Sequence, residues 1–262
     1  MRTAYKHCHL IIDDRREYLD GSIIINDEYI EDVFVNTKEF NDRDLKIVDL
    51  EGKILMPSFF DSKSKDEDDR GVNHKYVFSK SELNVPTHLY TEKEIDIAPK
   101  NVRAVTIQGN YKKLFTVRTL SSPLNKINVF ADGVSDITVN RLLSFDPINM
   151  LNHAMNNKCY VEFGIDNTVS DEYINFVLKN IDSDKLALVG YNHDPFIKQI
   201  KRLYKLNVSF NNIVALSSLN ALRFYNEDTL EGSLIKGKYA NIVCLNDNLD
   251  IEFVLNKGVK DA

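Results

Sequence analysis

The sequence is poor in glycine and histidine. Only 10 glycines occur among 262 residues, about half of the usual share of roughly 7%. None of the motifs GxxxxGK[ST], GxGxxG, GxSxG or HExxH is present. His7 and His9 have the spacing of a metal motif, but no third ligand cluster accompanies them, so we expect an exposed strand there. The other four histidines show no ligand spacing. Phosphate loops need glycine for positive φ angles and for close backbone approach. We therefore exclude these motif classes and expect neither a metal nor another cofactor.

Cysteines and long apolar runs are also scarce. The three cysteines, Cys8, Cys159 and Cys244, are scattered and odd in number, which is typical of reduced thiols rather than a disulfide framework or a zinc site. No apolar run approaches the ~18 residues of a transmembrane helix. The apolar stretch at residues 10–12 is too short for a signal peptide. We therefore expect a cytoplasmic protein with no membrane association.

The charge balance argues against other partner classes. The chain has 33 basic and 39 acidic residues, which gives a formal net charge of −6. A nucleic-acid binder or a polybasic membrane binder requires a basic surface, so neither is expected. Hydrophobic residues make up 43% of the chain, which is enough for a sizeable core.

Both ends of the chain have a purely β pattern, whereas the middle mixes strands with helices. Short apolar strands separated by turn residues cover the first ~58 and the last ~35 residues. Asn26 and Asp27 lie between two such strands and predict a hairpin turn. The middle alternates strands with helices predicted at residues 171–180, 195–206 and 210–225, the first with Ser170 as N-cap. This alternation favours a parallel sheet or barrel.

Four segments carry more specific patterns, namely GSIII at residues 21–25, VDLEGKILMPSFFD at 48–61, ALSSLNAL at 215–222 and EGSLIKGKYANIVCL at 231–245. Together they resemble motifs of the N-acetylglucosamine-6-phosphate deacetylases, a family of the amidohydrolase superfamily. The resemblance implies an α/β protein with a truncated or distorted TIM-like (β/α) barrel at residues 59–225. It also implies a small β-sandwich built from both chain ends, residues 1–58 and 226–262.

The family removes acetate from an amino-sugar phosphate through a metal-bound water, with an aspartate as general base. In this sequence the positions of its metal ligands and base are occupied by other residues. The HxH motif of the first barrel strand becomes Lys63 and Lys65, and the other positions hold Tyr76 for Glu, Arg118 and Val139 for His, and Tyr191 for Asp. The resemblance therefore predicts a catalytically inactive homologue with no catalytic and no metal-binding residues. The alternative is an active metal-dependent deacetylase with relocated ligands.

Lys63, Lys65 and Arg118 are the candidate ligand-binding residues. Residues i and i+2 of a strand share one face, so both lysines would point with Arg118 toward the former metal position. Three clustered cations are unfavourable unless an anion joins them. They therefore predict a pocket for a sugar phosphate or another small anion, with a protein partner as a second possibility. The alternative is that the side chains reach water, or that Asp61 and Asp66 neutralise them.

The barrel segment is short. Residues 59–225 fall well below the ~250 of a typical barrel, which leaves room for about five or six βα units. The link between Lys65 and Val72 is too short for a parallel crossover of a dozen or more residues, so the second strand unit is expected to be missing. A sheet open at this link predicts a homo-oligomer that covers the edge, or an anionic ligand that fills the pocket.

Overall fold

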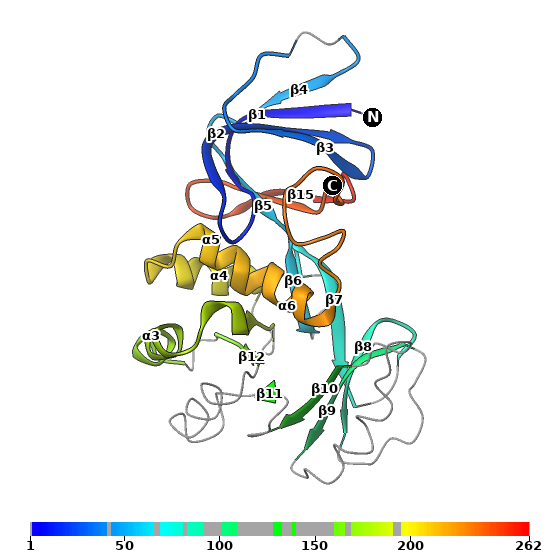
Figure 1. Cartoon of the computed structure of the whole chain (residues 1–262), viewed down its shortest axis with the longest axis vertical. Helices are drawn as coiled ribbons and strands as arrows, with labels where there is room; N and C mark the ends of the chain where they lie inside the picture. The colour runs from blue at the N-terminus through cyan, green and yellow to red at the C-terminus, as the bar shows by residue number, and fades with distance from the viewer. Residues whose placement is uncertain are drawn as a thin grey trace. The chain divides into compact units, whose positions relative to one another are not determined.

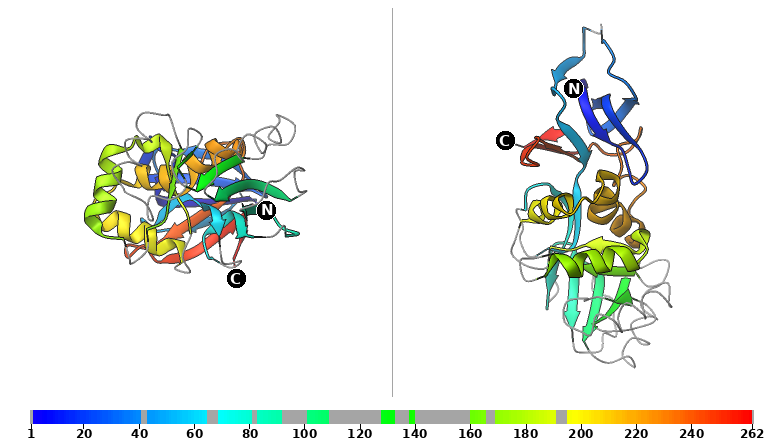
Figure 2. Two further views of the ribbon diagram at one scale, coloured as in Figure 1. Left: turned by 90° about the horizontal axis from the view of Figure 1, so that it is seen from below. Right: turned by 90° about the vertical axis from the view of Figure 1, so that its left-hand side faces the viewer.

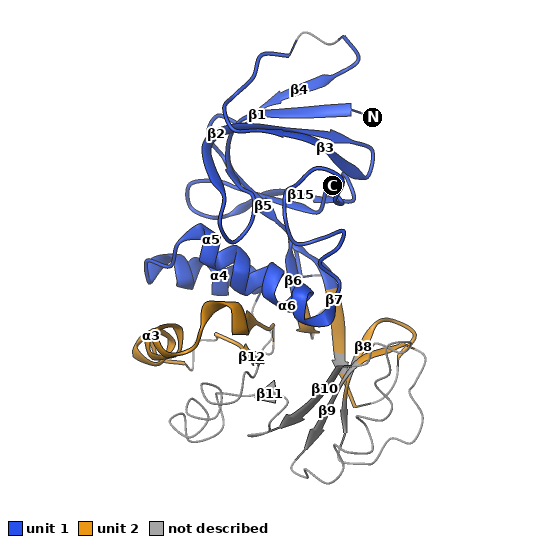
Figure 3. Ribbon diagram, in the orientation of Figure 1, with its two compact units in different colours: residues 1–60, 69–74, 195–262 blue, residues 61–68, 75–194 orange. Residues whose placement is uncertain are grey.

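The computed structural model describes residues 2–40, 43–64, 69–80, 83–91, 101–108, 128–132, 138–139, 160–165, 169–190 and 195–261 (Figure 1). The chain divides into two compact units. The first comprises residues 1–60, 69–74 and 195–262, and the second comprises residues 61–68 and 75–194 (Figure 3). None of the helices in these described ranges is long and apolar enough to cross a membrane.

The first unit contains an eight-stranded sheet, here called the terminal sheet, to which both ends of the chain contribute. Its order is β16-β15-β14-β5-β1-β2-β3, and β4 also pairs with β1. The strands are β1 (Arg2–Ile11), β2 (Glu17–Asn26), β3 (Tyr29–Phe34), β4 (Lys46–Asp49), β5 (Ile54–Pro57), β14 (Ile242–Leu245), β15 (Ile251–Asn256) and β16 (Val259–Lys260). The antiparallel pairing of β14 with β5, from Ile242 opposite Pro57 to Leu245 opposite Ile54, joins the two chain ends.

Turn chemistry and apolar packing explain the terminal sheet. The predicted hairpin is confirmed: β2 and β3 are antiparallel, and Asp27 has a φ of 51°, a conformation that Asn and Asp tolerate better than most residues. The core between the strands is a cluster of buried apolar side chains that includes Cys8 and Cys244, both free thiols. Burial raises the pKa of the Cys244 thiol to about 12, so this cysteine behaves as a small hydrophobic residue.

The helices follow their sequence signals closely. α3 (Asp171–Asn180) has the predicted bounds, and the Ser170 side chain accepts a hydrogen bond from the Tyr173 N–H, as an N-cap should. α4 (Phe196–Lys205) begins after Pro195. The third predicted helix is observed as α5 (Phe210–Val214) and α6 (Asn220–Tyr225), joined by a π-helical turn at Ala215–Leu219. Within the first unit, α4, α5 and α6 lie together at one end of the terminal sheet (Figures 1 and 2).

A second eight-stranded sheet, here called the parallel sheet, has its strands in sequence order from β6 to β13. The strands are β6 (Phe59–Ser64), β7 (Val72–Ser79), β8 (Thr87–Thr91), β9 (Val102–Gln108), β10 (Asn128–Asp132), β11 (Thr138–Val139), β12 (Tyr160–Phe163) and β13 (Leu186–Leu188). Within the described residues, the neighbouring strands from β7 to β13 pair in parallel. β9 pairs with β8 on one side and with β10 on the other (Figure 1).

This strand count corrects the expectation of a missing second strand. Short links, rather than deletion of a strand, account for the reduced length: only residues 65–71 separate β6 from β7, and only residues 80–86 separate β7 from β8. The N–H of Phe59 donates to the carbonyl of Gly71, so the first residue of β6 lies beside the residue that precedes β7. The sheet is therefore not open at this link.

The two ends of the parallel sheet are β6 and β13. Within the described residues, no strand pair joins β6 to β13, so the sheet is not closed into a barrel by backbone hydrogen bonds. The molecule is thus a mixed α/β protein with a parallel sheet of barrel-like strand order.

Candidate functional site

The candidate site lies on β6, where the sequence placed the first metal-ligand motif. All six residues of this strand are buried, yet four in succession are polar or charged: Asp61, Ser62, Lys63 and Ser64, each at most 4% exposed. Strands of parallel sheets are ordinarily apolar on both faces. A run of buried polar side chains on such a strand is therefore the feature that most needs an explanation.

Lys63 is paired with a buried carboxylate. Its Nζ lies 3.3 Å from Oε2 of Glu162, and the side chains are only 4% and 1% exposed. Glu162 belongs to β12, near the opposite end of the parallel sheet from β6. Two opposite charges removed from water in this way are strongly coupled, because little solvent is left to screen them. Lys63 thus has a buried counter-charge within the fold, the carboxylate of Glu162.

The carboxylate of Glu162 has a second contact. The hydroxyl of Ser62 donates to its Oε1 at 2.5 Å, and both residues are buried. One oxygen of Glu162 therefore accepts from Ser62 while the other faces Lys63. Charge-assisted hydrogen bonds of this length are stronger than neutral ones, so two consecutive residues of β6 hold the carboxylate in place.

Asp61 connects the two ends of the parallel sheet. Its Oδ1 accepts the backbone N–H of Lys63 and the backbone N–H of Gly190, both at 2.9 Å. Gly190 follows β13 by two residues. A Cβ atom at Gly190 would lie 2.2 Å from Oδ2 of Asp61, so a larger residue here would require the carboxylate to shift. A side chain thus links β6 to the segment after β13, where no strand pair between them is described.

The other predicted ligand-binding residues, Lys65 and Arg118, lie outside the described residues, as does Tyr191. Tyr76 is on β7 and is 2% exposed, and Val139 is on β11. The structure therefore places one residue of the predicted cationic set, Lys63. It adds Ser62 and Glu162, which the sequence reasoning did not single out.

Glu162 did leave a signal in the sequence. It is the one charged residue of the otherwise apolar strand YVEF at Tyr160–Phe163. A charge in the middle of a buried parallel strand is costly unless it is paired, so it marks a buried polar contact. The identity of the partner could not be read, because Glu162 and Ser62 are 100 residues apart in the chain.

A separate polar cluster in the first unit is centred on His74. Its Nε2 lies 2.6 Å from Oε2 of Glu227, its Nδ1 lies 3.0 Å from Oε2 of Glu231, and its ring contacts the edge of Phe60. Burial alone would lower the pKa of His74, but the two carboxylates outweigh it and raise this pKa to about 9. His74 is therefore a protonated clamp on the segment after α6.

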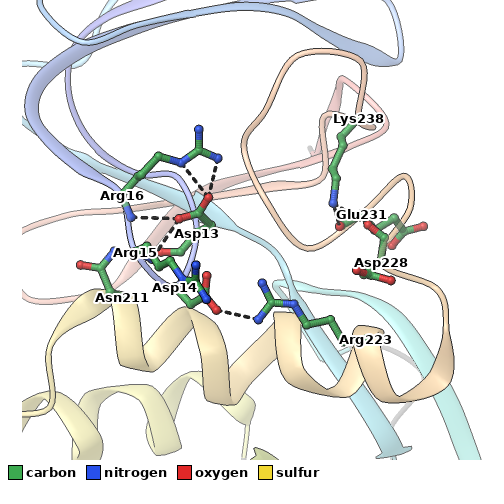
Figure 4. Close-up of polar contacts among 9 residues, drawn as sticks. All are labelled: Asp13, Asp14, Arg15, Arg16, Asn211, Arg223, Asp228, Glu231 and Lys238. Atoms are coloured by element: carbon green, nitrogen blue, oxygen red, sulfur yellow. Dashed lines mark hydrogen bonds and ion pairs between the residues drawn. The ribbon is translucent and has the colours of Figure 1, made fainter. Parts of the chain in front are cut away.

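Further charged residues lie at and near this segment (Figure 4). Lys238 donates to the backbone carbonyls of Asp228 and Glu231 at 2.5 and 2.7 Å, and burial lowers its pKa. Arg16 and Asp13 form a nearby pair at 2.5 Å. These charges are matched by partners within the first unit, so we assign the cluster a structural role.

Comparisons with known proteins give a consistent picture of the fold. No family model and no curated protein sequence matches this chain. The solved structure of N-acetylglucosamine-6-phosphate deacetylase from Pasteurella multocida matches with a TM-score of 0.82 at 12% identity, and 100% of each chain is covered. The enzyme from Mycobacterium smegmatis gives 0.77 at 12% with 100% of each chain covered. That from Thermotoga maritima gives 0.72 at 14%, covering 98% of this chain and 99% of the other.

This chain has the fold of these deacetylases. At such identities the likeness establishes the fold alone, and the chemistry must be argued from the residues. In the deacetylase fold the resemblance places metal ligands at the positions of Lys63, Tyr76 and Val139. An ammonium has no lone pair to donate, a phenol is protonated at neutral pH, and valine carries no donor atom. Among the described residues, no group of three or more His, Cys, Asp or Glu side chains could hold a metal ion. The donor set at these positions does not fit the metal.

Proposed function

We propose that this chain is a non-catalytic protein with the deacetylase fold, in which Lys63 takes the position of the first metal ligand. The observation that carries the proposal is the buried ion pair between Lys63 and Glu162, 3.3 Å apart. Metal-dependent amide hydrolysis needs a cation that activates a water molecule. An ammonium group neutralised by Glu162 supplies positive charge but cannot bind and polarise a water molecule as a Lewis acid does.

The decisive experiment measures metal content and activity on the same sample. Purified protein is analysed for bound transition metals and then incubated with N-acetylglucosamine 6-phosphate, with and without added Zn²⁺ or other divalent ions. We expect far less than one metal per chain and no acetate release above the protein-free rate. Near-stoichiometric metal together with acetate release would establish the alternative, an active deacetylase with relocated ligands.

We also propose a ligand for this protein, a sugar phosphate or a similar small anion that contacts Lys63 together with Lys65 and Arg118. Sites in (β/α) barrels are formed at the carboxyl ends of the strands, and Lys63 is the second-last residue of β6. Titration with glucosamine 6-phosphate and with uncharged glucosamine tests the proposal. Binding that requires the phosphate supports it, and equal or absent binding of both compounds contradicts it.

The ends of the parallel sheet suggest a further part of the proposal, self-association. β6 and β13 are the end strands of the parallel sheet in its strand order, and the end strand of a sheet can pair with another chain. Light scattering across a concentration series tests this point. A dimer or larger species supports it, and a monomer at all concentrations contradicts it.

A further inference from the structure

We infer that the π-helical turn at Ala215–Leu219 is a binding site for internal water, held by the hydroxyl groups of Ser217 and Ser218. This turn lies within the segment ALSSLNAL at residues 215–222, to which the proposed function gives no role. Both serines belong to the first unit, whereas the buried ion pair between β6 and β12 belongs to the second. The water site is therefore independent of the proposed ligand site.

The two serines lie in a stretch of helix that is buried on all sides. Every residue from Ile213 to Leu222 is buried, although successive residues of a helix point in different directions. Ser217 and Ser218 themselves are 0% and 1% exposed. Bulk solvent therefore cannot hydrate either hydroxyl.

Neither hydroxyl has a hydrogen-bond partner within the described part of the chain. A serine inside a helix commonly donates to the backbone carbonyl four residues earlier, which would be that of Ile213 for Ser217 and that of Val214 for Ser218. Neither serine makes this bond. The large majority of buried side-chain polar atoms are paired with the protein or with an ordered water molecule. Two adjacent exceptions therefore point to a ligand that supplies the missing bonds.

The local backbone favours water as that ligand. The N–H of Asn220 donates to the carbonyl of Ala215, five residues earlier, whereas the spacing in an α-helix is four. Insertion of a water molecule into the hydrogen-bond ladder is one of the recognised causes of irregularity in helices.

The chemistry of the segment also fits a neutral ligand. Residues 213–222 include no charged side chain, so the segment itself offers no counter-charge to an ion. Each hydroxyl can both donate and accept a hydrogen bond. A pair of hydroxyls can therefore provide most of the roughly three hydrogen bonds that a buried water molecule makes.

The test counts long-lived internal water molecules by oxygen-17 relaxation dispersion of the solvent around the whole chain. We expect the double variant Ser217→Ala/Ser218→Ala to lose the contribution of at least one such molecule. Ser209→Ala is the matched control, because Ser209 is exposed at the N-cap of α5, where its side chain accepts the N–H of Asn212. This variant loses a hydroxyl from the same helical segment, and its dispersion should equal that of the wild type.

A crystal structure of the wild-type protein decides the question if the double variant does not fold. We expect an ordered water molecule within hydrogen-bond distance of Oγ of Ser217 or Ser218. The absence of water from both hydroxyls overturns the inference, and so does an unchanged dispersion in a folded double variant. Neither measurement involves metal, acetate or anion binding, so its failure is distinct from a failure of the proposed function.

Discussion

Two lysine–glutamate pairs among the described residues have the same separation, one at the terminal sheet and one within the parallel sheet. In the terminal sheet, Nζ of Lys53 lies 3.3 Å from Oε2 of Glu252, and the side chains are 37% and 36% exposed. In the parallel sheet, Lys63 and Glu162 are also 3.3 Å apart, but they are 4% and 1% exposed. Distance does not distinguish the pairs, whereas their access to water does.

The two sheets differ in whether their charged side chains are buried. None of the charged residues on the strands of the terminal sheet is buried, and its interior is filled with apolar side chains such as Leu10 and Leu55. The parallel sheet carries charge on a fully buried strand. A buried charge pair gains little net stability over apolar residues of the same shape, so stability alone does not account for Lys63 and Glu162. This is the physical reason to look for function in the parallel sheet.

The largest expected effect comes from breaking the buried pair. Lys63→Met leaves Glu162 buried without its ammonium, and we expect a loss of about 3–5 kcal/mol in the free energy of unfolding. The double variant Lys63→Met/Glu162→Leu should recover most of that loss, because no unpaired charge remains. Urea unfolding of the three proteins measures both changes. A single variant as stable as the wild type would show that the pair is not buried in solution.

The second effect concerns His74, whose pKa is raised to about 9 in the fold from the ordinary value of 6.5. A raised pKa stabilises the fold fully below the unfolded value, and this contribution disappears as the pH rises through the folded value. The free energy of unfolding should therefore fall by about 2–3 kcal/mol between pH 6.5 and pH 9 relative to His74→Gln. Parallel curves for the two proteins over this interval would contradict the clamp.

A smaller loss is expected from Gly190→Ala. The new methyl group would meet Oδ2 of Asp61 at 2.2 Å and push the carboxylate off its two backbone donors. Overpacking of this kind costs about 1–3 kcal/mol. Gly237→Ala is the control, because nothing lies within 4 Å of its Cβ position although its φ is +87°, so its cost is that of backbone strain, about 1–2 kcal/mol. Thermal unfolding of the two variants measures these losses, and a Gly190→Ala protein as stable as the wild type would contradict the close contact with Asp61.

The smallest effect should come from the exposed counterpart of the buried pair. Lys53→Met removes the ammonium that faces Glu252, and water can solvate the carboxylate that remains. Exposed pairs contribute roughly 0–1 kcal/mol, so urea unfolding should barely change. A loss comparable to that of Lys63→Met would mean that the contrast between the two sheets has been misjudged.

Local signals in the sequence predicted local structure well. Ser170 followed by two acidic residues located α3 to the residue, and Asn26-Asp27 located the hairpin of β2 and β3, because caps and turns depend on neighbouring residues. The strand count failed for a different reason. It assumed a crossover of a dozen or more residues between parallel strands, whereas β6, β7 and β8 follow one another through short links. The domain boundaries and the sandwich description stay predictions.

The candidate site was predictable only in part. Lys63 was located because it occupies the first position of the family's HxH motif, which can be found in a single sequence from the residues around it. Its partner Glu162 was not located, because it lies about a hundred residues further along the chain. A single sequence does not show which distant residues are in contact. Asp61 was considered as a neutralising charge for Lys63. In the structure its carboxylate instead accepts backbone donors on β6 and after β13.

The pairing of β14 with β5 has a consequence for how this chain is made. A ribosome releases β5 long before it releases β14, and at roughly 5–20 residues per second the interval is on the order of 10 to 40 seconds. During that time the nascent β5 can pair with β1 but not with β14. Its four apolar residues ILMP then form an unpaired strand edge to which other chains can bind. In this interval the growing chain is most prone to aggregate and to bind chaperones. Pairing of β14 with β5 removes the exposed edge once the last strands are synthesised.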